Sequence, residues 1–111
     1  MGGSNLDRID QIKTITANVE GWLSTREGAL LHRCARRCSR RGSIVEVGSW
    51  KGKSTIWLAC GSQDGSGQPV YAVDTFAGSS EHLEAAGEKV WTFDDFKANL
   101  QHAGVEDLVV P

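Results

Sequence analysis

The sequence lacks the segments that place a protein in or across a membrane. No apolar run approaches the length of a transmembrane helix, and the amino terminus has no hydrophobic stretch of the kind found in secretory signal peptides. A surplus of positive charge is also absent, because the net charge is −2 at pH 7, so nucleic acid is not favoured as a bulk partner. We therefore expect a cytoplasmic protein with no membrane or nucleic-acid partner.

Cysteine is scarce, and the three cysteines do not form a recognisable metal-binding pattern. Cys34 and Cys38 lie four residues apart with His32 nearby, but no further ligands follow at a usual zinc spacing. We expect free thiols, with Cys60 in the core, and no metal site. The arginine-rich range 33–41 leaves two interpretations open, an anion-binding surface or a solvated helix face.

What the sequence does contain is a strand, a glycine turn and a helix start within residues 44–55. Gly48 and Gly52 allow the backbone to approach a ligand where any Cβ atom would clash. A second strand, Pro69–Asp74, ends on an acid. Asp74 follows Gly48 by 26 residues and Gly52 by 22, close to the position of an acid that accepts hydrogen bonds from ribose hydroxyls in parallel α/β proteins. The spacing predicts one βαβ unit that binds a nucleotide-like cofactor.

Three classes of cofactor compete for this turn. A dinucleotide fingerprint needs a glycine where Trp50 stands. A Walker A loop is one residue longer, although Lys53 and Ser54 keep a phosphate-binding nucleotide module as an alternative. The third pattern, E-x-G-x-x-x-G-x-[ST] followed by a strand-terminal acid, begins at Glu46 and reaches its acid at Asp74.

This ordered set resembles motif I and the acidic motif of class I S-adenosylmethionine-dependent methyltransferases. The stretches LSTREG (23–28), IVEVGSWKGKSTIWLA (44–59) and VYAVDTFAGSSEH (70–82) are similar to the small-molecule O-methyltransferase-like group that includes macrocin O-methyltransferase and cephalosporin-hydroxylase-type proteins. The resemblance covers about residues 20–111, the amino-terminal part of such a domain. It implies a partial Rossmann-like α/β fold, a three-layer sandwich with parallel strands in the order 3-2-1, preceded by amino-terminal helices.

The resemblance implies S-adenosylmethionine as cofactor and assigns contacts to it position by position. The two glycines line the methionine part, Glu46 orients its amino group, and Asp74 holds the ribose hydroxyls, with Thr75 and Phe76 beside the adenosine. Trp50 would shield the sulfonium or cover the following helix. The alternative that Glu46 and Asp74 only cap strand ends stays open. The full set of cofactor-binding candidates is Glu46, Gly48, Ser49, Trp50, Gly52, Ser54, Asp74, Thr75 and Phe76.

The resemblance also implies that the catalytic residues and the pocket for a small-molecule acceptor lie beyond Pro111, so no residue is assigned to methyl transfer. We expect a truncated domain, with a helical segment at 1–23 and the amino-terminal half of a Rossmann-like S-adenosylmethionine-binding domain at 24–111. The strand that carries Glu46 would then be an open edge. We expect a homodimer, formed through that edge or by swapping the first helices. A non-catalytic dimerising protein that kept half of the fold is the alternative.

Helix-capping residues and the spacing of apolar residues predict the other helices and strands. Ser24 and Glu27 form a capping box for a helix that runs to about Arg41, where Gly42 would end it. A later helix ends at Gly104. The remaining elements are expected at residues 6–15, 43–47, 54–61, 92–103 and 107–110.

Two further residues each keep two interpretations. His82, in the loop after Asp74, is a general base or metal ligand, or else a solvent-exposed loop histidine. Trp91 either packs at the start of the helix that follows it or flanks the adenosine.

Overall fold

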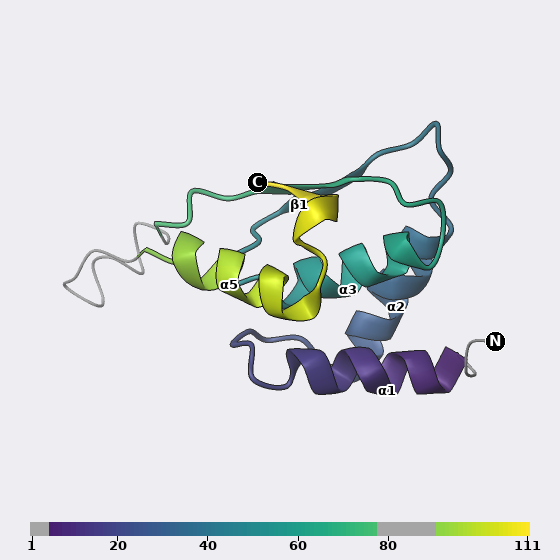
Figure 1. Cartoon of the computed structure of the whole chain (residues 1–111), viewed down its shortest axis with the longest axis horizontal. Helices are drawn as coiled ribbons and strands as arrows, with labels where there is room; N and C mark the ends of the chain where they lie inside the picture. The colour runs from purple at the N-terminus through teal and green to yellow at the C-terminus, as the bar shows by residue number, and fades with distance from the viewer. Residues whose placement is uncertain (1–4, 78–90) are drawn as a thin grey trace.

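The computed structural model describes residues 5–77 and 91–111, and these form helices packed against a small sheet (Figure 1). No helix in these two ranges is long and apolar enough to cross a membrane. Its elements in chain order are α1 (Asn5–Thr16), α2 (Thr25–Arg36), β1 (Ile44–Val47), α3 (Lys53–Gln63), β2 (Val70–Val73), α5 (Phe93–Ala103), the 3₁₀ helix η1 (Glu106–Leu108) and β3 (Val109–Val110).

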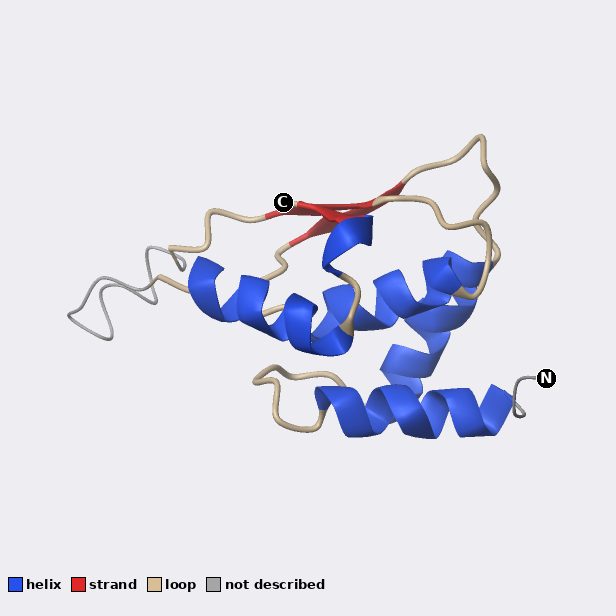
Figure 2. Ribbon diagram, viewed as in Figure 1, coloured by secondary structure: helices blue, strands red, loops and turns tan. Residues whose placement is uncertain are grey.

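The three strands are parallel and lie in the order β1-β2-β3 (Figure 2). Ile44 pairs with Val70, and Val70 in turn pairs with Val109. The helix α3 carries the chain from β1 to its parallel neighbour β2, which makes the predicted βαβ unit. The partial Rossmann-like α/β fold, with β1 at an edge of the described sheet, is therefore confirmed. The expected three layers are not all present in residues 5–77 and 91–111, because their helices cover only one face of the sheet (Figure 2).

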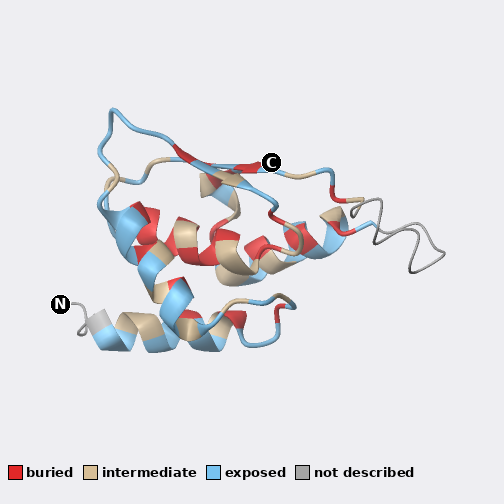
Figure 3. Cartoon of the chain, turned by 180° about the vertical axis from the view of Figure 1, so that it is seen from behind, coloured by how far each residue is buried: buried red, intermediate tan, exposed pale blue. Residues whose placement is uncertain are grey.

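The helices of the described residues cover one face of the sheet (Figure 2). Ile44, Val70 and Ala72 are buried on that face, and Figure 3 shows that buried residues gather on α3 and around the sheet, whereas α1 is largely exposed. Parallel sheets are usually covered on both faces, so their strands are apolar on both. The strand residues on the opposite face are apolar but exposed: Val45, Val47, Tyr71, Val73 and Val110.

Two glycines allow α2 and α3 to pack closely. A Cβ atom on Gly28 of α2 would lie 2.4 Å from Cε2 of the buried Trp57 on α3. A Cβ atom on Gly61 of α3 would lie 2.3 Å from the carbonyl oxygen of His32. The helices therefore approach to a distance that only glycine permits at these positions.

The helix α2 begins as predicted but ends earlier. Ser24 and Glu27 make the reciprocal hydrogen bonds of a capping box. The prediction that the helix reaches Arg41 is wrong, because α2 ends at Arg36 and Gly42 does not cap it.

Contacts from the loop after α3 explain the early end of α2. The hydroxyl of Ser66 donates to the carbonyl of Cys38 at 2.9 Å, and the Gln68 amide donates to the carbonyl of Ser39 at 2.9 Å. A Cβ atom on Gly65 would lie 2.3 Å from the carbonyl oxygen of Arg36, so this loop presses on the last turn. Backbone groups beyond Arg36 are thus satisfied by partners distant in sequence rather than by further helical turns.

The carboxyl-terminal elements follow the prediction more closely. The helix α5 has Asp94 and Asp95 in its first turn and ends at Gly104, whose φ of 71° is left-handed. The last strand is shorter than the predicted 107–110, because residues 106–108 form a 3₁₀ turn before β3.

Candidate functional site

The turn after β1 leads into α3 and lies beside the end of β2, the central strand of the sheet. Gly48 has a φ of 87° and donates its N–H to the carbonyl of Val73 at 2.8 Å. No atom lies within 4 Å of where its Cβ atom would be, so this side of the turn is open. Gly52 has a φ of 94° and precedes α3, but its Cβ position faces Phe96 at 3.2 Å. Gly48 therefore faces open space, whereas Gly52 packs against α5.

The carboxylate of Glu46 fastens the first turn of α3 to β1. It accepts a hydrogen bond from the hydroxyl of Ser54 at 2.5 Å and another from the hydroxyl of Thr55. The helix begins at Lys53, one residue before the predicted start, and Gly52 offers no side chain to cap it. Sequence reasoning omitted Thr55 from the site, although its position beside Ser54 was the available signal.

Asp74 holds two loops with one carboxylate. Its Oδ2 accepts from the backbone N–H of Trp50 at 2.7 Å, and its Oδ1 accepts from that of Phe76 at 2.8 Å. Both donors have left-handed backbone, with φ of 47° at Trp50 and 57° at Phe76. Because side-chain-bearing residues rarely adopt this conformation, the carboxylate stabilises an otherwise unfavourable shape of both loops.

The two residues after Asp74 point in different directions. Thr75 is exposed, and its hydroxyl accepts from the N–H of Ala77. The Phe76 ring is buried, with its centroid 5.1 Å from that of Phe93 and 4.8 Å from that of Phe96. Phe76 thus anchors its loop on α5 and presents mainly backbone to the end of the sheet.

A cleft of about 250 Å³ lies between the glycine turn and the segment that joins α1 to α2. We call that segment, residues 17–24, the strap. Its residues 20–23 form one wall of the cleft, and residues 48–51, 53 and 54 form the other. Sequence reasoning did not bring the strap to the site, because its proximity to the turn depends on how α1 packs.

The cleft contains an unsatisfied polar group. Ser49 is only 3% exposed, and its hydroxyl is the one buried side-chain polar atom without a hydrogen-bond partner within residues 5–77 and 91–111. Such groups in native proteins are unusual and call for a physical explanation. An incoming polar group in the cleft would supply the missing partner.

Lys51 joins the strap, the glycine turn and α5. Its ammonium lies 3.0 Å from the Glu20 carboxylate and 5.0 Å from the Trp50 ring centroid, and its carbonyl accepts from Asn99 at 2.9 Å. Lys53, by contrast, makes no ion pair with any described residue and begins a helix without an acid in its first turn. The cleft therefore has one neutralised cation and one free cation beside the positive end of a helix dipole.

Three other candidates lie away from the cleft or outside the described residues. His32 is buried, and its Nε2 lies 2.7 Å from Asp64, which also accepts from Arg8 at 2.7 Å. Neither this cluster nor any other in residues 5–77 and 91–111 groups three or more possible metal ligands. Burial raises the pKa of the Cys60 thiol to about 11, so this cysteine is a core thiol. His82 lies outside the described residues.

Comparison with known families agrees with the geometry at the ends of β1 and β2. A family model described as a methyltransferase domain matches residues 45–111, which include β1 from its second residue, the glycine turn, α3, β2, α5 and β3. The match covers well over half of the chain. It includes both acids that lie at the ends of neighbouring parallel strands, Glu46 and Asp74. The chain therefore belongs to this family of methyltransferase domains, whose Rossmann-like architecture it shares.

Proposed function

We propose that this methyltransferase uses S-adenosylmethionine to methylate a hydroxyl group of a small molecule, as the macrocin O-methyltransferase and cephalosporin-hydroxylase-type group does. The observation that carries the proposal is the double hydrogen bond of Asp74. One carboxylate organises both the glycine turn and the loop after β2, at the carboxyl ends of adjacent parallel strands. Ligands of open parallel sheets bind at these ends.

The cofactor would lie across the two loops. Asp74 keeps lone pairs free for ribose hydroxyls, because each of its oxygens accepts one backbone hydrogen bond and a carboxylate oxygen has two acceptor sites. Thr75 and the backbone of Phe76 would lie beside the adenosine. The methionine end would enter the cleft at Gly48, Ser49 and Ser54.

Charge supports a sulfonium cofactor over a phosphate-bearing one. The half-buried carboxylate of Glu46 lies beside the turn and would repel a phosphate, but it attracts an ammonium or a sulfonium. Ser54, which the phosphate alternative needs, already donates its hydroxyl to Glu46. Of the two lysines, Lys51 is neutralised by Glu20. Lys53 alone is a weak basis for a triphosphate site.

The bound sulfonium would supply a methyl group to the acceptor hydroxyl. The new O–C bond forms as the S–C bond breaks, the electron pair stays on sulfur, and the hydroxyl proton leaves to solvent or a base. Among residues 44–76, the chain contributes cofactor binding and orientation, and we assign no residue to proton transfer.

Calorimetric titration of the wild-type protein with S-adenosylhomocysteine, S-adenosylmethionine and ATP tests this function. We expect saturable binding of the first two and none of ATP. Asp74→Asn should weaken binding roughly 10- to 100-fold, the range for a lost hydrogen bond to a charged group. Asp107→Asn, which changes an exposed acid on η1, is the matched control.

Thermal unfolding of each variant shows whether the loops still form, since Asp74 also supports two strained residues. Absence of heat with both sulfur compounds in the folded wild-type protein would overturn the proposal. ATP binding that disappears in Lys53→Ala would favour the phosphate-binding alternative instead.

We also propose that residues 24–111 are the amino-terminal half of the cofactor-binding domain, that 1–23 are a helical addition to it, and that two copies associate. Support for association comes from the outer edge of β1, which pairs with no strand of the described residues, and from the exposed apolar face of the sheet, on which Val47 is 81% exposed. Open strand edges beside apolar surface pair readily with another chain. The helical addition contributes the strap residues 20–23 to the cleft.

A further inference from the structure

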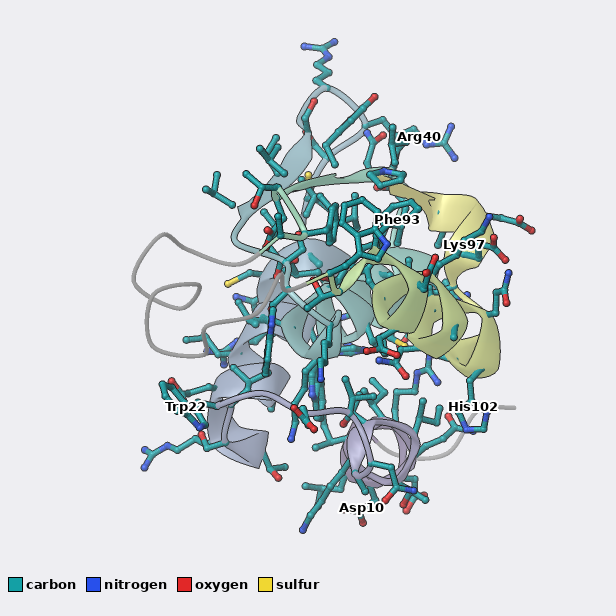
Figure 4. All side chains as sticks on the ribbon, turned by 90° about the vertical axis from the view of Figure 1, so that its left-hand side faces the viewer. Asp10, Trp22, Arg40, Phe93, Lys97 and His102 are labelled. Carbon is teal, nitrogen blue, oxygen red and sulfur yellow. The ribbon has the colours of Figure 1, made fainter. Side chains whose placement is uncertain are left out.

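Trp22 is wholly exposed on a strap that is firmly held. On one side of it Val19 is buried and Glu20 pairs with Lys51, and on the other side Ser24 begins the capping box of α2. Figure 4, which faces the end of the molecule where β2 leads into the grey segment, shows Trp22 projecting at the surface. Burying this exposed indole against a ligand would contribute about 2 kcal/mol of hydrophobic free energy.

Lys53 offers the cleft a partner for one negatively charged group, although its single charge is too little for a triphosphate. Lys53 has no ion-pair partner in residues 5–77 and 91–111, and it stands at the amino-terminal end of α3, where backbone N–H groups are free. The buried hydroxyl of Ser49 lines the cleft without a partner. Both observations are independent of Trp22. Lys53 favours an anionic ligand group, whereas Ser49 favours a polar group, which the methionine end of the cofactor would supply.

The volume of the cleft limits the size of the ligand that it can hold. At about 250 Å³ it lies just below the roughly 300–1,000 Å³ of pockets that enclose drug-sized molecules. It therefore suits one ring with its substituents beside the end of the cofactor, and not a whole nucleotide.

We propose that the methyl acceptor is a small planar aromatic acid, with its ring stacked on Trp22 and its carboxylate directed toward Lys53. The proposal rests on the proposed function and names the substrate class of that site. Stacking on an indole favours a flat ring over a saturated one. The free lysine favours a carboxylate over a neutral group of the same shape.

Nuclear magnetic resonance titration with matched probes tests the class of ligand. 4-Hydroxybenzoate is compared with 4-hydroxycyclohexanecarboxylate, which keeps the charge but is not flat, and with 4-hydroxybenzamide, which is flat but neutral. We expect 4-hydroxybenzoate to bind best, and each of the other two roughly tenfold more weakly. Equal binding of all three probes, or binding of none, overturns the proposal.

Variants with matched controls locate the binding. Trp22→Ala should weaken 4-hydroxybenzoate roughly tenfold, whereas Trp91→Ala, which removes another exposed tryptophan, should not. Lys53→Gln should weaken it similarly, whereas Lys97→Gln on the exposed surface of α5 should not. Trp22→Ala should leave the affinity for S-adenosylhomocysteine unchanged. Equal losses in target and control variants overturn the assignment.

A competition experiment between 4-hydroxybenzoate and S-adenosylhomocysteine distinguishes failure of the acceptor proposal from failure of the proposed function. We expect 4-hydroxybenzoate to bind in the presence of saturating S-adenosylhomocysteine, which makes a ternary complex. If the two compounds displace each other, the cleft belongs to the cofactor alone and the acceptor proposal fails while the proposed function stands. If S-adenosylhomocysteine does not bind at all, the proposed function fails and the role of the aromatic acid as acceptor fails with it.

Discussion

At the scale of single residues, the carboxylate of Asp74 does more than offer acceptors to a ligand. It holds the left-handed backbones of Trp50 and Phe76, each of which costs on the order of 1–3 kcal/mol when unsupported. The shape of the site therefore depends on a group that would also contact the cofactor. Loss of Asp74 would weaken the support of two loops and, in the proposed complex, remove a contact to the cofactor as well.

Gly28 offers a test of close packing between α2 and α3. An alanine inside a helix normally gains about 1 kcal/mol over glycine, but here its Cβ atom would lie 2.4 Å from the buried Trp57 ring. Overpacking costs roughly 1–3 kcal/mol in most cores, and the tight ring contact puts Gly28→Ala at the upper end. We expect a net loss of about 1–2 kcal/mol in the free energy of unfolding, measured with urea.

Gly42→Ala is the matched control for that substitution. Gly42 does not have a left-handed backbone, and its nearest neighbour is the Cys38 sulfur at 3.2 Å, on a side chain that can move. We expect a change within about 0.5 kcal/mol. A stabilised Gly28→Ala protein would show that α2 and α3 do not pack as closely as described.

At the scale of elements, three helices meet at one carboxylate. Asp64, which caps α3, accepts from Arg8 on α1 and lies 2.7 Å from Nε2 of His32 on α2. Burial raises the pKa of Asp64, but the hydrogen bonds from Arg8 and His32 outweigh burial, so the pKa lies below its ordinary value of 3.8. Ionisation of this carboxylate therefore strengthens the junction of α1 with α2 and α3.

The lowered pKa of Asp64 predicts acid sensitivity. A carboxyl group whose pKa is lower in the folded state stabilises the fold above the unfolded pKa, and this stabilisation is lost as pH falls through the folded value. The free energy of unfolding should therefore drop more steeply below about pH 4 in the wild type than in Asp64→Asn. Asp107→Asn should keep the wild-type slope. Identical slopes in Asp64→Asn and the wild type would contradict the role of this junction.

Local signals in the sequence predicted the elements that depend on local chemistry. The glycine turn, the parallel βαβ unit, the capping box at Ser24 and the stop at Gly104 were all predicted correctly. The end of α2 was not, because Ser66 and Gln68 determine it from across a loop. The strap was missed for the same reason, since only three-dimensional packing brings residues 20–23 to the turn.

At the scale of the whole molecule, the described residues cover one face of the sheet and leave the other apolar. Val47→Lys places a charge on that face, whereas Leu6→Lys places one on an exposed apolar position of α1. We expect light scattering to report a dimer for the wild type and for Leu6→Lys, and a monomer for Val47→Lys, because a buried unpaired charge is costly. A monomeric wild type at micromolar concentration would contradict self-association.

The strap lies before the start of the family match, yet it forms a wall of the cleft. The surface proposed for the acceptor therefore combines Trp22 of the strap with Lys53 of the matched range, whereas the surface proposed for the cofactor lies wholly within that range. In evolutionary terms, the proposed role of Trp22 implies that substitutions in a short exposed segment would change which molecule is methylated without disturbing the sheet or the cofactor loops. Relatives that agree closely from residue 45 onward should accordingly differ most in substrate where their straps differ.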